Sequence, residues 1–210
     1  VYGEGVAVLA AVALLNQAYA LLTRAAAAAG EGGGGAQAGT TEALLTEATR
    51  AVGADGMIGG QMLDLELQAT SANDRALASR DLKTVALMRL MMVAGAQARG
   101  AERETIEALA GFGERFGRVY QICDDLLDEL GERALSGKTP RQDARHLRPS
   151  AVSVLGAGAS ESLAVALARE GASLLTGKFG ARGEACVLIE AAEMLLRKVN
   201  SVGAEQIPVS

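Results

Sequence analysis

Three aspartates, Asp124, Asp125 and Asp128, lie close together in a stretch of the chain that is otherwise largely apolar. Residues three and four positions apart share one face of a helix, so Gln121 would point the same way as the three carboxylates. Carboxylates this close repel one another unless a cation compensates their charge. Mg²⁺ prefers oxygen ligands and keeps coordination positions open for phosphate oxygens. The pattern therefore predicts a Mg²⁺ site that can hold a diphosphate group.

The alternative explanation is a solvated acidic face near the end of a helix, without a metal. The flanking sequence favours the metal site, because it is too apolar for a fully solvated helix. It also carries Gly111, Gly113 and Gly117, whose small size would let another helix approach closely.

Cationic residues that could meet an anion occur at two other places. Lys83, followed by Thr84, begins a strongly apolar run, so its side chain either reaches along that run to solvent or points into a cavity to meet an anion. The polar segment 131–149 follows the acidic stretch and contains Lys138 and Arg148. This segment is either a solvated connector or a lid that closes over phosphates.

The composition indicates a single all-α domain over residues 1–210. Half of the residues are hydrophobic and only 3% are aromatic, whereas strands are enriched in β-branched and aromatic residues. A chain of 210 residues can hold one substantial core. The net charge of −5 argues against nucleic-acid binding, but it leaves anionic substrates open because a metal inverts the local electrostatics.

The elements that must position these residues are predicted from apolar periodicity and capping residues. Thr40 or Thr41 is expected to cap the second helix and Asp74 the fourth. Gly59 and Gly60 fall inside the third helix, where their cost suggests close approach by another backbone or a ligand. The predicted helices cover 5–29, 40–52, a segment around Gly59, 74–98, 101–130, 150–155, 160–175 and 182–199.

Residues 5–22 are apolar enough to raise the question of a membrane span. Asn16 and Gln17 interrupt this stretch and no basic flank sets an orientation. We therefore expect no membrane span but a helix buried in the core or in a dimer interface. The sequence starts at Val1 and is expected to begin partway through a domain.

The cysteines indicate a reducing compartment. Cys123 and Cys186 lie far apart in apolar runs, and with the single histidine, His146, they form no zinc-binding pattern. We expect two reduced core thiols and a cytoplasmic protein.

Taken in order, the motifs resemble those of the trans-isoprenyl diphosphate synthases, the family of farnesyl and geranylgeranyl diphosphate synthases. The resemblance extends along essentially the whole chain. The segments that match motifs of the family are Tyr2-Gly3-Glu4, the Gly59-Gly60-Gln61-x-x-Asp64-Leu65 segment, the Lys83-Thr84 pair, the second aspartate-rich motif from Gln121 to Asp128, and the late-loop cations Lys138 and Arg148.

The resemblance implies a helical bundle around a central cavity, usually a homodimer. It further implies Mg²⁺-dependent condensation of an allylic prenyl diphosphate with isopentenyl diphosphate, giving a longer product such as farnesyl or geranylgeranyl diphosphate. The roles that it implies for single residues are Mg²⁺ binding by Asp124, Asp125 and Asp128, diphosphate contact by Lys83, Lys138 and Arg148, and a place beside the reacting carbons for Thr84 and Gln121.

Two alternatives remain open. The first aspartate-rich motif of the family is not among these residues, and Val12 stands where the family has aspartate. These departures support a non-catalytic, regulatory subunit-like homologue that binds a partner synthase or a prenyl diphosphate. An unrelated carboxylate-metal helical bundle is the third reading, although His146 has no partner for the Glu-x-x-His pairs of di-iron proteins.

Overall fold

The computed structural model describes residues 2–31, 39–67, 81–135, 150–180 and 186–204. Every regular element within these ranges is helical, which confirms the all-α prediction. In chain order the elements are α1 (Glu4–Glu31), α2 (Thr40–Val52), α3 (Met57–Leu67), the π-helical turn η1 (Asp81–Val85), α5 (Ala86–Ala98), α6 (Arg103–Leu135), α8 (Ala151–Leu155), α9 (Ala157–Phe179) and α11 (Val187–Ala204).

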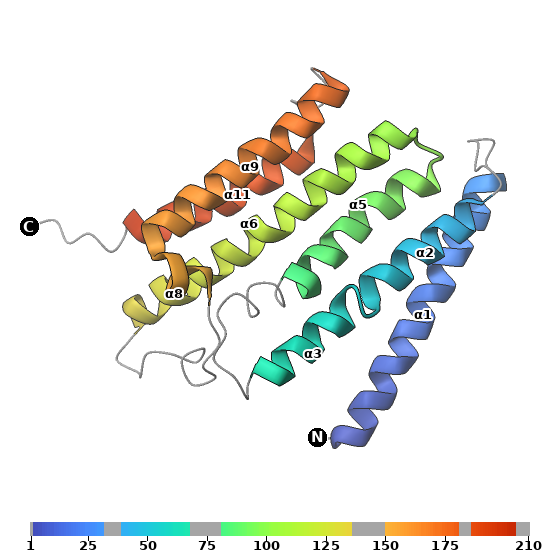
Figure 1. Ribbon diagram of the computed structural model, residues 1–210, viewed down its shortest axis with the longest axis horizontal. Helices are drawn as coiled ribbons and strands as arrows, with labels where there is room; N and C mark the ends of the chain where they lie inside the picture. Colours follow the sequence, from blue (N-terminus) through green and yellow to red (C-terminus); the bar gives the residue numbers. More distant parts are fainter. Residues whose placement is uncertain (1, 32–38, 68–80, 136–149, 181–185, 205–210) are drawn as a thin grey trace, which may run out of the picture.

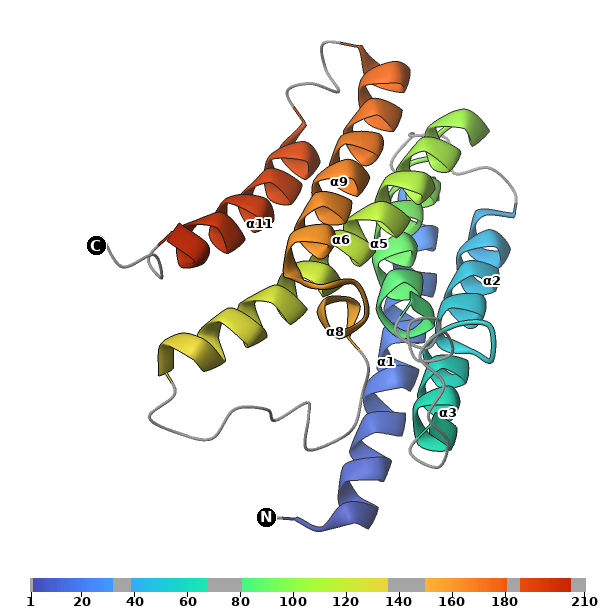
Figure 2. The ribbon, with the colours of Figure 1, turned by 60° about the vertical axis from the view of Figure 1, so that its left-hand side comes forward.

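The long helix α6 is the central element of the arrangement. It packs against α5 on one side and α9 on the other, and α2 and then α1 continue the layer beyond α5 (Figure 1). Helix α11 contacts both α6 and α9. The turn η1, helix α3, helix α8 and the C-terminal half of α6 all lie toward the same end of the layer (Figures 1 and 2).

Helix α6 is amphipathic, and its apolar face forms much of the core. Phe112 and Val119 are almost completely buried, and Ile122, Cys123 and Leu126 continue the same stripe at helical spacing. The C-terminal part of this stripe packs with α8 and α9. Because the apolar face is occupied in this way, the polar residues of α6 must lie elsewhere on its surface.

Close packing between α5 and α6 depends on two glycines, as the sequence predicted. A Cβ atom at Gly113 would lie 2.9 Å from the Cα atom of Arg89, and one at Gly117 would lie 3.0 Å from the Cα atom of Val85. A side chain at Gly113 would force a neighbouring backbone to shift, and one at Gly117 would require its neighbours to move by a few tenths of an ångström. These glycines therefore let η1 and α5 approach the face of α6 that leads to the aspartates.

Helix α1 has an unusual surface. Residues Glu4–Ala28 form a helix long and apolar enough to cross a membrane, with a mean hydropathy of 1.9. It packs against α2 and α5. Among its residues whose exposure is described, only Ala26 is buried. The expectation of a core helix is thus wrong for this chain taken alone, because its apolar side chains, such as Leu9 and Leu14, are exposed. An interface with another molecule stays a prediction.

Two predicted helix starts can be compared with the structure. Gly39, with φ of 102°, occupies the N-cap position of α2, so the prediction that Thr40 or Thr41 caps this helix is wrong. The left-handed backbone conformation at that position favours glycine. Asp74, the predicted cap of the fourth helix, and residues 32–38 lie outside the described residues.

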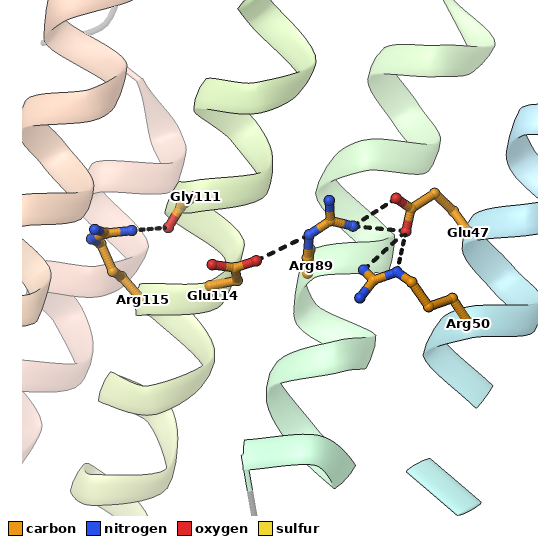
Figure 3. A network of polar contacts seen from close by, with 6 residues as sticks. All are labelled: Glu47, Arg50, Arg89, Gly111, Glu114 and Arg115. Atoms are coloured by element: carbon orange, nitrogen blue, oxygen red, sulfur yellow. Dashed lines mark hydrogen bonds and ion pairs between the residues drawn. The ribbon is translucent and has the colours of Figure 1, made fainter. Parts of the chain in front are cut away.

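A chain of ion pairs joins α2, α5 and α6 (Figure 3). The guanidinium group of Arg89 donates to both carboxylate oxygens of Glu47, each at 2.7 Å, and to Glu114 at 3.1 Å. Arg50 also donates to Glu47, at 3.1 Å. Burial acts to raise the pKa of Glu47, but the hydrogen bonds and charges of Arg89 and Arg50 outweigh it and hold that pKa below its ordinary value. No local sequence pattern predicts this network, because its members come from three helices that are distant in the chain.

Arg89→Met is expected to lower the free energy of unfolding by about 1–2 kcal/mol near pH 7, because it leaves the partly buried Glu47 with less compensation. The side chains of Arg89 and Glu47 are 21% and 18% exposed, so the effect should be smaller than for a fully buried pair. Urea unfolding followed by circular dichroism measures it.

The same variant should reveal a pH dependence. The pKa of Glu47 is lowered in the folded state, so the stabilisation is present above its ordinary value of 4.5 and is lost as pH falls through the lowered value. The stabilities of Arg89→Met and the wild type should therefore converge under acidic conditions. Arg103→Met, which removes an exposed pair with Glu107, serves as the control and should change stability by less than about 0.5 kcal/mol.

Candidate functional site

Helix α6 presents two of the three predicted aspartates to solvent. Asp124 and Asp128 are exposed and lie one helical turn apart, and Gln121 is half-buried one turn before Asp124. Asp125 is different, because it is only 6% exposed. The predicted acidic face thus divides into two exposed carboxylates and one that turns toward the protein interior.

The buried aspartate has a backbone partner. The N–H group of Ala151, the first residue of α8, donates a hydrogen bond to Oδ2 of Asp125 at 3.1 Å. Ala151 and the neighbouring Val152 are themselves buried and belong to the core cluster around Ile122 and Leu126. Asp125 therefore links the acidic helix to the start of α8.

Cys123, next to this acidic face, is buried and free, and Cys186 is also free. The prediction of a core thiol is confirmed for Cys123, whereas Cys186 is only partly buried. Burial, reinforced by the charge of the adjacent Asp124, raises the pKa of the Cys123 thiol to about 11. The thiol is consequently protonated at neutral pH and is a poor nucleophile.

Lys83 and Thr84 lie in η1, which packs directly against α6. The short connection between α5 and α6 makes these helices antiparallel neighbours, with Val85 beside Gly117. Continuing this register places the turn with Lys83 and Thr84 opposite residues 117–121, about one turn before Asp124. Both side chains are half-buried. A π-helical turn of this kind is often found at functional sites.

The glycine pair of α3 lies near this turn, because α3 packs against η1. A Cβ atom at Gly59 would lie 1.7 Å from the carbonyl oxygen of Ala54, and Gly60 is buried. The structure thus explains Gly59 by the backbone of its own preceding turn, and the predicted approach of another backbone or a ligand stays a prediction.

Two predicted cations, Lys138 and Arg148, lie outside the described residues. Within the described ranges, no three carboxylate, histidine or cysteine side chains are arranged as a metal centre. Asp124 and Asp128 nonetheless fit a magnesium ion, since this metal commonly binds one or two protein carboxylates and completes its shell with water and phosphate oxygens.

A separate groove runs along the outer side of α2. It has a volume of about 870 Å³, and none of the predicted site residues lines it. Its lining residues are Thr41, Glu42, Leu45, Thr46, Thr49, Arg50, Gly53, Ala54 and Asp55. The groove therefore lies apart from the candidate site on α6 and η1.

Comparison with known proteins identifies the family to which the chain belongs. The family model described as polyprenyl synthetase matches residues 1–170, which include α3, η1 and the acidic part of α6. The chain belongs to the polyprenyl synthetase family. This confirms the resemblance drawn from the motifs and rules out an unrelated carboxylate-metal bundle.

Individual members of the polyprenyl synthetase family are similar to the chain. The farnesyl diphosphate synthase of Bacillus subtilis is 33% identical over 161 residues, covering 75% of this chain and 52% of the relative. The dimethylallyltranstransferase of Fischerella ambigua is 33% identical over 172 residues, covering 81% and 48%. The chain thus spans about half the length of the relatives that it matches.

Solved structures of polyprenyl synthetases have the same fold. The geranyltransferase of Helicobacter pylori, solved with magnesium and isoprenyl diphosphate, superimposes with a TM-score of 0.59 and is 26% identical. The match covers 79% of this chain and 54% of that one.

Proposed function

We propose that this chain acts in a Mg²⁺-dependent prenyltransferase that condenses an allylic prenyl diphosphate with isopentenyl diphosphate to give a longer isoprenyl diphosphate. The observation that carries the proposal is the placement of two exposed carboxylates, Asp124 and Asp128, on α6 beside the turn that holds Lys83 and Thr84. Farnesyl or geranylgeranyl diphosphate is the expected class of product.

Each described site residue has a role that suits its place. Asp124 and Asp128 hold the metal through carboxylate oxygens, and Lys83 contacts the diphosphate of the allylic substrate. Thr84 and Gln121 lie beside the carbons that react. Bound Mg²⁺ would stabilise the negative charge that grows on the departing diphosphate.

The apolar residues around η1 and α6 have a complementary task. When the carbon–oxygen bond to diphosphate breaks, the allylic carbon becomes electron-deficient and water would capture it. Side chains such as Met88, which is partly buried on α5 beside Gly117 of α6, help to exclude water. Lys138 and Arg148 are proposed as additional diphosphate contacts on the basis of the resemblance alone.

A condensation assay tests the proposal. The chain is incubated with an allylic diphosphate and labelled isopentenyl diphosphate, with Mg²⁺ or with EDTA. A longer, labelled prenyl diphosphate that forms only with Mg²⁺ is the expected result. Mg²⁺-dependent binding of the allylic substrate without any product would instead favour the non-catalytic homologue.

We also propose that the chain forms a homodimer through α1 and works in the cytoplasm. The exposed apolar side chains of α1 support the first proposal, because a contiguous apolar surface marks an interface. The two free thiols support the second.

A further inference from the structure

Asp125 has different surroundings from Asp124 and Asp128, although all three belong to one motif. It is 6% exposed, and the buried residues Ile122 and Leu126 stand beside it on α6. Its Oδ2 atom accepts the Ala151 N–H group of α8 at 3.1 Å, in a buried setting. The other two aspartates are exposed.

The start of α8 needs such an acceptor. The first N–H groups of a helix have no partner within the helix, and a buried donor without a partner carries its full desolvation penalty. Ser150 and Ser153 satisfy two other backbone N–H groups by capping each other reciprocally. The Ala151 N–H group is satisfied from α6 instead, and a charged acceptor makes this hydrogen bond stronger than a neutral one.

The same surroundings disfavour direct metal binding at Asp125. Mg²⁺ gives up its water reluctantly and usually keeps several water ligands. A hydrated ion with a bound diphosphate therefore meets the exposed carboxylates of Asp124 and Asp128 more readily than one buried against α8. Asp124 and Asp128 lie one helical turn apart and can act together.

We infer that Asp125 is a positioning residue that anchors α8 to α6, whereas Asp124 and Asp128 are the metal ligands of this helix. Asp125 lies between the two ligands in sequence, so its hydrogen bond holds the start of α8 against the part of α6 that carries Asp124 and Asp128. The metal-binding half of this inference rests on the proposed function, while the anchoring half rests on the hydrogen bond alone.

Three variants separate the two roles. In Asp125→Asn the amide oxygen can still accept the Ala151 N–H group, but the charge that a metal needs is gone. Asp125→Ala removes both functions. Asp124→Asn removes a charge at an exposed position on the same helix and is the matched control. Circular dichroism establishes that each variant is folded.

The anchoring half is tested by hydrogen exchange without any ligand. Exchange in the peptide that covers α8 is expected to rise roughly tenfold or more in Asp125→Ala and to change by less than about threefold in Asp125→Asn. Unchanged exchange in Asp125→Ala would overturn the anchoring role. If that variant does not fold, Asp125→Leu, which has a similar shape but no acceptor, takes its place, and unchanged exchange there overturns the role.

The metal half is tested by calorimetric titration of inorganic diphosphate in the presence of Mg²⁺. Asp124→Asn is expected to weaken binding by about 100-fold, while Asp125→Asn should stay within about threefold of the wild type. Equal losses in the two variants would make Asp125 a ligand and overturn the inference. Absence of binding to the wild type would count against the proposed function, whereas the exchange result would still decide the anchoring.

Discussion

Asp124→Ala is expected to abolish Mg²⁺-dependent binding of an allylic prenyl diphosphate. The side chain is an exposed carboxylate on α6, one turn before Asp128 and about one turn beyond the residues that face Lys83. Loss of groups that merely support a metal ligand weakens metal sites by about 10- to 100-fold, so loss of a ligand should cost at least about 100-fold. Calorimetric titration with Mg²⁺ present measures the effect.

The helix itself should tolerate this substitution. Alanine has the highest helix propensity, and Asp124 is not buried, so helix content and thermal midpoint should stay close to those of the wild type. Asp55→Ala, at an exposed position in the turn between α2 and α3, is the control and should leave binding unchanged. Equal affinity in Asp124→Ala and the wild type would remove Asp124 from the metal site.

Gly117→Leu is expected to destabilise the protein by about 2–3 kcal/mol and to weaken diphosphate binding as well. A Cβ atom at this position would lie 3.0 Å from the Cα atom of Val85 and 3.3 Å from side-chain atoms of Met88. The larger side chain must therefore push η1 and α5 away from α6. That movement would carry Lys83 and Thr84 away from the aspartate face.

Gly95→Leu is the matched control, because it places the same side chain on an exposed position of α5 where nothing lies within 4 Å of the added Cβ atom. Helix propensity alone should then stabilise the control by about 0.5–1 kcal/mol. Chemical unfolding gives the stability and calorimetry gives the affinity. If Gly117→Leu unfolds and binds like the control, the close approach of η1 to α6 does not position the site.

The sequence was informative where a signal is local. A continuous apolar periodicity predicts a helix over 101–130, and α6 (Arg103–Leu135) follows it with its apolar side buried. The small residues Gly113 and Gly117 predict a closely packed neighbouring helix, and α5 is that neighbour. The direction of Asp124 follows from its position on the same helix. These features depend on residues within a few turns of one another.

The sequence was less informative where partners are distant in the chain. The aspartate motif does not show that Asp125 has a partner in α8, because the Ala151 N–H group comes 26 residues later in the chain. Arg89 stands among apolar residues, which signals that a charge needs compensation, but not that Glu47 and Glu114 supply it. Both contacts arise from tertiary packing, which a local pattern does not show.

The most direct test of the central claim is a calorimetric titration of an allylic prenyl diphosphate into the wild-type chain, first with Mg²⁺ and then with EDTA. The acidic face of α6 predicts binding in the presence of Mg²⁺ that disappears when EDTA removes the metal. Binding that persists unchanged in EDTA, or no binding with Mg²⁺ present, would contradict the claim that Asp124 and Asp128 form a metal-diphosphate site.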